Sequence, residues 1–140
     1  MAWSLSSYEA YIYTVRNLSS YIQASNLVFI RRGKFLAEVE GSIIFDKDII
    51  LEMRENLSFR DDAFIRRYGY LVKKGSDILY WYDSQPHPNN PELQSTHPHH
   101  KHIPPDIKHH RIPAPGLSFE EPNLTFLIRE IESQYFSSQP

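Results

Sequence analysis

The sequence predicts an α+β protein, in which a five-stranded antiparallel meander is flanked by an N-terminal and a C-terminal helix. Three observations lead to this prediction. Between residues 27 and 83, runs rich in β-branched and aromatic side chains are separated by short turns, which is typical of successive antiparallel strands. Apolar residues recur at helical spacing near both ends of the chain. Between the last strand and the last helix lies a segment that contains eight of the ten prolines and all seven histidines.

A chain of 140 residues is long enough to bury one hydrophobic core, and we expect residues 1–140 to form a single domain. The absence of cysteine excludes disulfides, thiolate metal ligands and a cysteine nucleophile. No apolar run approaches the roughly 18 residues of a membrane-spanning helix, and the N-terminus has no secretory pattern, so we expect a cytoplasmic protein. The net charge of −2 argues against general coating of nucleic acid, although clustered basic residues leave a local basic face open.

The first helix is expected at about 7–23, because apolar residues recur every three or four positions after the capping-box pattern Ser6…Glu9. The turn-like Arg32-Gly33-Lys34 and Asp46-Lys47-Asp48, together with Gly75-Ser76-Asp77, divide the following segment into strands. These strands are expected at 27–31, from 35 onward, and at 49–55, 63–73 and 78–83.

Residues 84–117 are expected to form a long Pro/His-rich loop, and a segment of this length in a compact domain is usually functional or disordered. Its prolines restrict the backbone around the histidines, which favours a fixed course. A second amphipathic helix is expected at about 122–136, after the capping-box pattern Ser118…Glu121. Both helices have one apolar face, so we expect both to cover the same face of the sheet.

The stretch THPHHKH, residues 96–102, places four histidines in six consecutive positions. Such a cluster fits a metal site, a proton-transfer site or a solvated polar loop. Its spacing matches no zinc motif, although imidazole is a ready zinc ligand. Histidine also suits both proton transfers of metal-independent RNA cleavage, because its pKa lies near neutrality. Taken alone, the residues leave these three interpretations open.

From about residue 7 to residue 135, the order of these features resembles the TumE-like toxin family of bacterial and archaeal toxin–antitoxin operons. The resemblance rests on the strand end Leu79-Tyr80-Trp81-Tyr82-Asp83, on Pro86-His87-Pro88 and on the histidine stretch that follows. It implies a growth-inhibiting toxin that is held inactive by a helix-turn-helix antitoxin encoded beside it. Relatives often have a histidine in the fourth strand, where this chain has Arg66-Arg67-Tyr68-Gly69-Tyr70.

The hypothesis that follows is a cytoplasmic toxin that cleaves RNA without a metal ion or other cofactor. His99 and His102 are expected to act as base and acid, with His97 beside them and Asp83 orienting a histidine. Residues expected to hold RNA by charge, hydrogen bonding or stacking are Lys101, His100, His87, Arg66, Arg67, Tyr68 and Tyr70.

Two alternatives remain open on the sequence. One is transfer of a nucleotidyl or other group to RNA, although the chain has no Gly-Ser element with paired acidic ligands. The other is a binding module that inhibits translation by occupying its target without turnover. The expected partners are the antitoxin and RNA, with no membrane, and assembly as a homodimer is left open.

Overall fold

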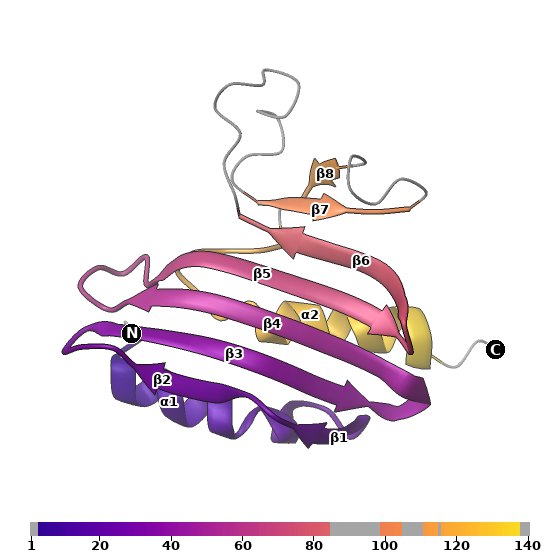
Figure 1. The fold of residues 1–140 in the computed structure, drawn as a ribbon, viewed down its shortest axis with the longest axis horizontal. Coiled ribbons are helices and arrows are strands. Elements are labelled where there is room, and N and C mark those ends of the chain that lie inside the picture. The colour runs from indigo at the N-terminus through magenta and orange to yellow at the C-terminus, as the bar shows by residue number, and fades with distance from the viewer. Residues whose placement is uncertain (1–2, 85–98, 105–110, 115, 138–140) are drawn as a thin grey trace.

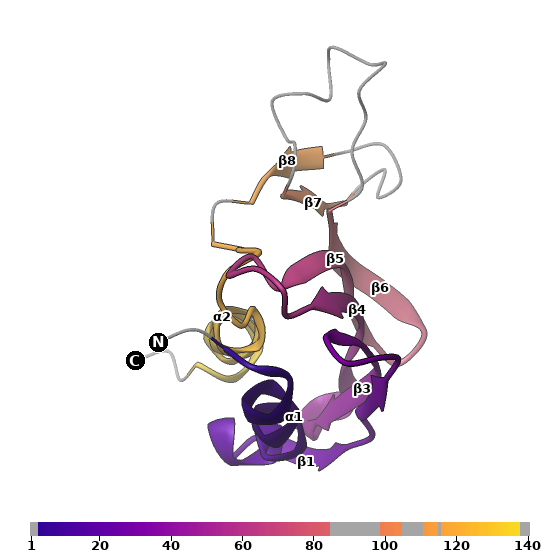
Figure 2. The ribbon, with the colours of Figure 1, turned by 90° about the vertical axis from the view of Figure 1, so that its left-hand side faces the viewer.

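Helices pack against one face of a curved antiparallel sheet in the computed structural model, which describes residues 3–84, 99–104, 111–114 and 116–137 (Figures 1 and 2). The chain begins with α1 (Leu5–Tyr13) and a 3-10 turn (Val15–Leu18), and it ends with α2 (Leu124–Ile131), which a π-helical segment (Glu132–Phe136) continues. The strands between them are β1 (Ile22–Ser25), β2 (Val28–Arg31), β3 (Leu36–Phe45), β4 (Ile49–Ser58), β5 (Ile65–Lys74), β6 (Asp77–Asp83), β7 (His100–His102) and β8 (Arg111–Pro113).

Within the described residues, the strands form one eight-stranded sheet in the order β1-β3-β4-β5-β6-β7-β8, with β2 pairing beside β1 on β3. All pairings are antiparallel. Strands β2 to β6 confirm the predicted meander, but the count of five is wrong. Strands β7 and β8 lie inside the segment 84–117 that was expected to be a loop. Each has only three residues, and each is defined by pairing with its neighbour instead of by an apolar pattern of its own.

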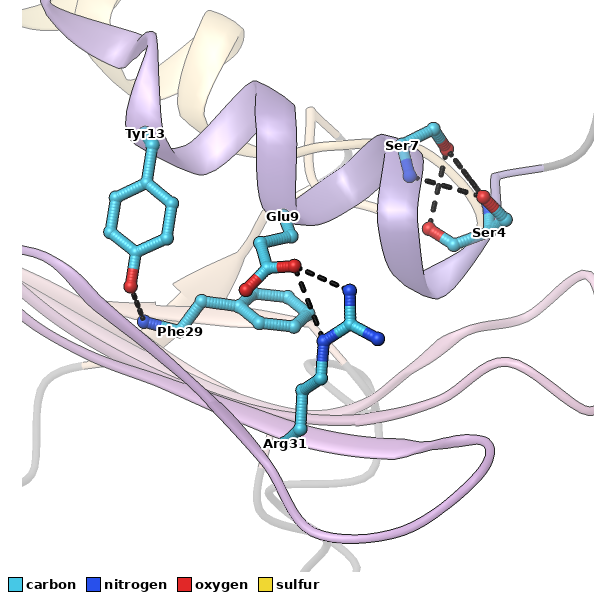
Figure 3. A network of polar contacts seen from close by, with 6 residues as sticks. All are labelled: Ser4, Ser7, Glu9, Tyr13, Phe29 and Arg31. Atoms are coloured by element: carbon cyan, nitrogen blue, oxygen red, sulfur yellow. Dashed lines mark hydrogen bonds and ion pairs between the residues drawn. The ribbon is translucent and has the colours of Figure 1, made fainter.

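The N-terminal helix is shorter than the predicted 7–23 and has a different cap. Ser4 is the N-cap: its hydroxyl accepts from the Ser7 backbone N–H at 3.1 Å, and the Ser7 hydroxyl accepts from the Ser4 N–H at 2.9 Å (Figure 3). Helix α1 ends at Tyr13, and Ile22 already belongs to β1. The apolar spacing continued past the helix because residues of the 3-10 turn and of β1 are buried in the same core.

The C-terminal helix begins at Leu124, just after the predicted start. The Ser118 hydroxyl does accept from the backbone N–H groups of Glu120 and Glu121, at 2.9 and 3.2 Å. The chain becomes helical only after Asn123, however. The capping-box pattern therefore marks a turn just before the helix and not the start of the helix itself.

Alternation along the strands gives the sheet two different faces. On β4, Leu51, Met53 and Leu57 are buried on the side that carries the helices, where they share a core with Leu127 and Ile128 of α2. The intervening residues face the other side, which no described helix covers (Figure 2). We call this side the open face; it comprises Glu52, Arg54 and Asn56 of β4, Arg67, Gly69 and Leu71 of β5, and Trp81 and Asp83 of β6.

Helix α1 also closes one edge of the sheet. The Phe29 backbone N–H in β2 donates to the Tyr13 hydroxyl at 3.0 Å, and Nη2 of Arg31 lies 2.5 Å from Oε1 of Glu9 (Figure 3). An N–H group that no strand satisfies is therefore satisfied by a helix side chain. None of the helices in the described residues has the length and apolar character needed to cross a membrane.

Candidate active site

Strand β7 brings His102 onto the open face beside the end of β6. It pairs with β6 in the register Trp81↔His102 and Asp83↔His100. Nε2 of His102 lies 2.9 Å from Oδ2 of Asp83, and the imidazole stacks on the indole of Trp81 with ring centroids 4.3 Å apart. The indole N–H of Trp81 donates to the same carboxylate oxygen at 3.3 Å. Asp83, which is predicted to orient a histidine, thus contacts His102, and its role in orienting that ring stays a prediction.

Lys101 extends from the opposite side of β7, towards helix α2. Its ammonium lies 3.1 Å from Oε2 of Glu130 and 4.3 Å from the ring centroid of Tyr80. The Tyr82 hydroxyl donates to the same Glu130 oxygen at 2.7 Å. Both partners of the ion pair are about 15% exposed. Lys101, expected to bind substrate, thus joins β7 to the helix layer.

His99 lies just before β7 and contacts the helix side of the sheet. Its Nδ1 is 2.5 Å from the hydroxyl of Tyr68, and the two rings are nearly parallel. Phe119 packs against the imidazole, with ring centroids 4.5 Å apart. Burial, together with the negative charge of Asp83, raises the pKa of the Tyr68 hydroxyl, so this hydroxyl remains protonated at neutral pH.

The two histidines expected to act as a base–acid pair are therefore not brought together on one face. His102 lies with Asp83 and Trp81 on the open face, whereas His99 packs on Tyr68, whose ring faces the helices. His87 and His97 lie outside the described residues. For His100 only the backbone in β7 is described, opposite Asp83.

An open groove of about 690 Å³ runs along the open face beside this pair. Its walls include Arg54 and Asn56 of β4, Arg67 of β5, and Trp81 and Asp83 of β6. Tyr68 and Tyr70, expected to stack on bases, point instead to the helix side and are at most 5% exposed. Of the aromatic residues on this hairpin, Trp81 is the one whose side chain lines the groove from the open face.

Cross-strand ion pairs neutralise most of the charge on the open face. Lys73 pairs with Glu52 at 2.5 Å, and Arg54 lies 3.9 Å from Glu40. Arg66, predicted to hold phosphate, is 3.5 Å from Asp61. Arg67 makes no ion pair with any residue in the described part of the chain. It is therefore the candidate cation for a negatively charged ligand in the groove.

A polar network inside the core was not predicted. The Glu55 side chain is fully buried and accepts hydrogen bonds from the hydroxyls of Tyr8, at 2.6 Å, and Tyr70. The Asn123 amide donates to the Tyr70 hydroxyl at 3.0 Å. Burial raises the pKa of the Glu55 carboxyl, while the tyrosine hydrogen bonds act in the opposite direction. The network joins α1, β4, β5 and the start of α2, so it has a structural role.

The described residues contain no group of three or more His, Asp or Glu side chains that could hold a metal ion. Several histidines that would be the first candidates for such a group are outside those residues: His87, His97, His109 and His110.

Comparison with protein families gives one finding. A family model described as toxin TumE matches residues 12–135, most of the chain. The chain belongs to the TumE toxin family. This confirms the resemblance drawn from the strand end at Asp83 and the histidine stretch. Searches of curated proteins and of solved structures found no significant match. Membership of the TumE family indicates a toxin, and a toxin of this kind implies an antitoxin partner.

Proposed function

We propose that this TumE-family toxin cleaves RNA without a metal ion, and that the Asp83–His102 pair carries out one of the two proton transfers. The observation that supports this is the 2.9 Å contact between Nε2 of His102 and Oδ2 of Asp83, next to a groove that contains Arg67. A carboxylate that holds an imidazole fixes its tautomer and stabilises its protonated form.

The reaction sets what these groups must do. A base removes the proton of a ribose 2′-hydroxyl, and the 2′-oxygen then bonds to the adjacent phosphorus. The bond from phosphorus to the 5′-oxygen breaks as an acid supplies a proton to that oxygen. A nearby cation stabilises the negative charge that builds up on the phosphate oxygens. We assign the last role to Arg67.

The position of the pair suggests which member meets the RNA. Asp83 lines the groove, whereas the His102 side chain is only 2% exposed and is not part of the lining. In our proposal the Asp83 carboxylate takes the 2′-hydroxyl proton, and His102 positions this carboxylate through the contact between Nε2 and Oδ2. His99, predicted as the other proton-transfer group, lies on the helix side of the sheet, where the Tyr68 hydroxyl contacts it. It could act on the same phosphate only by moving to the open face.

The test is incubation of the purified protein with total cellular RNA, with and without EDTA, for the wild type, Asp83→Asn and His102→Ala. We expect cleavage that persists in EDTA and falls about a hundredfold or more in both variants, the usual effect of removing a general acid or base. Asp77→Asn is the matched control, because it makes the same change at the exposed start of the same strand. Circular dichroism shows whether each variant is folded.

His99→Ala separates the two histidines, because full activity in that variant would remove His99 from the mechanism and leave the pair on the open face. Cleavage that EDTA abolishes and one added metal restores would make the histidine stretch a ligand set. Intact RNA in every assay would contradict the proposed reaction and favour group transfer or a non-catalytic toxin.

A further inference from the structure

Gly69 lies in the middle of β5 at the floor of the groove, and the fold gives no reason for a glycine there. It pairs with Arg54 of β4 and Asp83 of β6. Its φ is not in the left-handed region, and a Cβ built on it would meet no described atom within 4 Å. Glycine weakens a strand interior because it gains no packing and loses much conformational freedom on folding.

Gly41 shows what a structurally required glycine looks like in the same sheet. Its φ is +136°, and a Cβ there would lie 2.3 Å from the carbonyl oxygen of Asn26. Any side chain at that position would force β3 away from the link between β1 and β2. Gly69 meets neither condition. A glycine in a strand that neither conformation nor packing requires commonly marks a place where a ligand lies close to the backbone.

The surroundings of Gly69 indicate which ligand. Its neighbours Tyr68 and Tyr70 face the helices, so a ligand above Gly69 would rest on the backbone of β5. Trp81 and Leu71 offer flat and apolar surface, and Arg67 offers a cation that no described acid neutralises. A planar ring with a phosphate attached matches this combination, because aromatic side chains stack on bases and arginine holds phosphate.

We infer that Gly69 forms the floor of a nucleotide subsite, in which one base of single-stranded RNA lies over the β5 backbone beside Trp81 while Arg67 holds its phosphate. This inference rests on the proposed function, since it takes RNA as the ligand. It adds a binding site on the open face that places the RNA backbone next to Asp83. A double-stranded RNA would present no free base face, so the subsite selects single strands.

The experiment separates ligand binding from folding by adding a side chain at Gly69, on the floor of the groove. Gly69→Ala and Gly69→Val place a side chain in the groove without touching the core. Because both residues suit a strand better than glycine, we expect melting temperatures equal to or above that of the wild type. Short 2′-O-methyl RNA has no free 2′-hydroxyl and so resists cleavage. Its binding should weaken about tenfold or more in Gly69→Val, and less in Gly69→Ala. Gly33→Ala is the matched control, because Gly33 lies in the turn between β2 and β3, does not line the groove, and an added Cβ would make only an ordinary contact with Leu36, at 3.9 Å.

The fluorescence of Trp81 reports binding at this place directly. The chain has two tryptophans, so Trp81 is the only tryptophan in the Trp3→Phe protein. We expect the oligonucleotide to change this fluorescence in the Trp3→Phe protein and to lose the effect when Gly69→Val is added. Wild-type affinity in a folded Gly69→Val protein would overturn the inference, and so would a Trp81 response to the antitoxin but not to RNA. If oligonucleotide binds in this way but no RNA is cleaved, the proposed reaction fails while the subsite stands.

Discussion

At the scale of single residues, Glu55 stands out because it is an acidic residue at a position of β4 that faces the hydrophobic core. On β4 the residues Leu51, Met53 and Leu57 face the core, and Glu55 shares their parity. That parity is visible in the sequence and could have revealed a buried carboxyl. The tyrosine and asparagine partners could not have been found in this way, because they come from α1, β5 and the turn before α2.

The Glu55 carboxyl should make stability depend on pH. Burial raises its pKa above the ordinary value of 4.5, so the folded protein keeps this proton to a higher pH than the unfolded chain. Its contribution to the free energy of unfolding is therefore complete below about pH 4.5 and is lost as the pH rises through the folded pKa. We expect Glu55→Gln to have a melting temperature that falls less over this window than that of the wild type.

Thermal unfolding of both proteins from pH 4.5 upward measures the difference. Each tenfold difference in proton affinity between the folded and unfolded Glu55 carboxyl corresponds to about 1.4 kcal/mol in the free energy of unfolding. Glu38→Gln is the control, because it makes the same change at an exposed position beside Arg32. Parallel curves for Glu55→Gln and the wild type would contradict the expected titration of Glu55.

At the scale of elements, the central meander was predictable and its extension was not. The turns around Gly33, Lys47 and Gly75 mark three of the four connections between β2 and β6. Strands β7 and β8 have three residues each and contain no apolar alternation, so only their pairing with the rest of the sheet reveals them. The same pairing decides which face each histidine takes. The sequence could therefore mark Asp83 and His102 as candidates by their chemistry, but it could not show that His99 and His102 lie on different faces of the sheet.

Strand β7 is anchored to α2 by the Lys101–Glu130 ion pair, so breaking this pair should disturb the strand that carries His102. Glu130→Gln would leave the mostly enclosed Lys101 ammonium without its partner. We expect a loss of about 2 kcal/mol in the free energy of unfolding, below the range for fully buried pairs because some exposure remains. Glu38→Gln breaks an exposed pair with Arg32 and should cost well under about 1 kcal/mol.

Urea denaturation of the two variants tests this difference, and RNA cleavage by the folded Glu130→Gln protein tests the link to His102. Equal stability losses in the two variants would mean that the Lys101–Glu130 pair is no better than a surface contact.

At the scale of the whole molecule, a formal net charge of −2 and a largely neutralised open face limit how RNA can be held. Affinity for a single strand falls with salt in proportion to the number of phosphates neutralised, with a logarithmic slope of about −0.7 for each. With Arg67 as the main cation, we expect a shallow slope of about −1.

Titrations of a short 2′-O-methyl RNA at increasing potassium chloride measure this slope. Arg67→Gln should flatten it further, while Arg16→Gln, an exposed arginine on the 3-10 turn of the opposite layer, should not. A slope near −3 or steeper would show that the RNA contacts a much broader basic surface than the groove provides.

The contact between Tyr13 and the Phe29 N–H also bears on how copies of the chain can associate. Sheets polymerise into fibres when both of their borders accept another strand, and each added copy then offers a border to the next. Here a strand arriving at β2 would find the Phe29 N–H already bonded to the Tyr13 hydroxyl and would have to displace α1. Growth of a fibre through β2 therefore requires α1 to move away first, and this protects the β2 edge of the toxin against fibre formation.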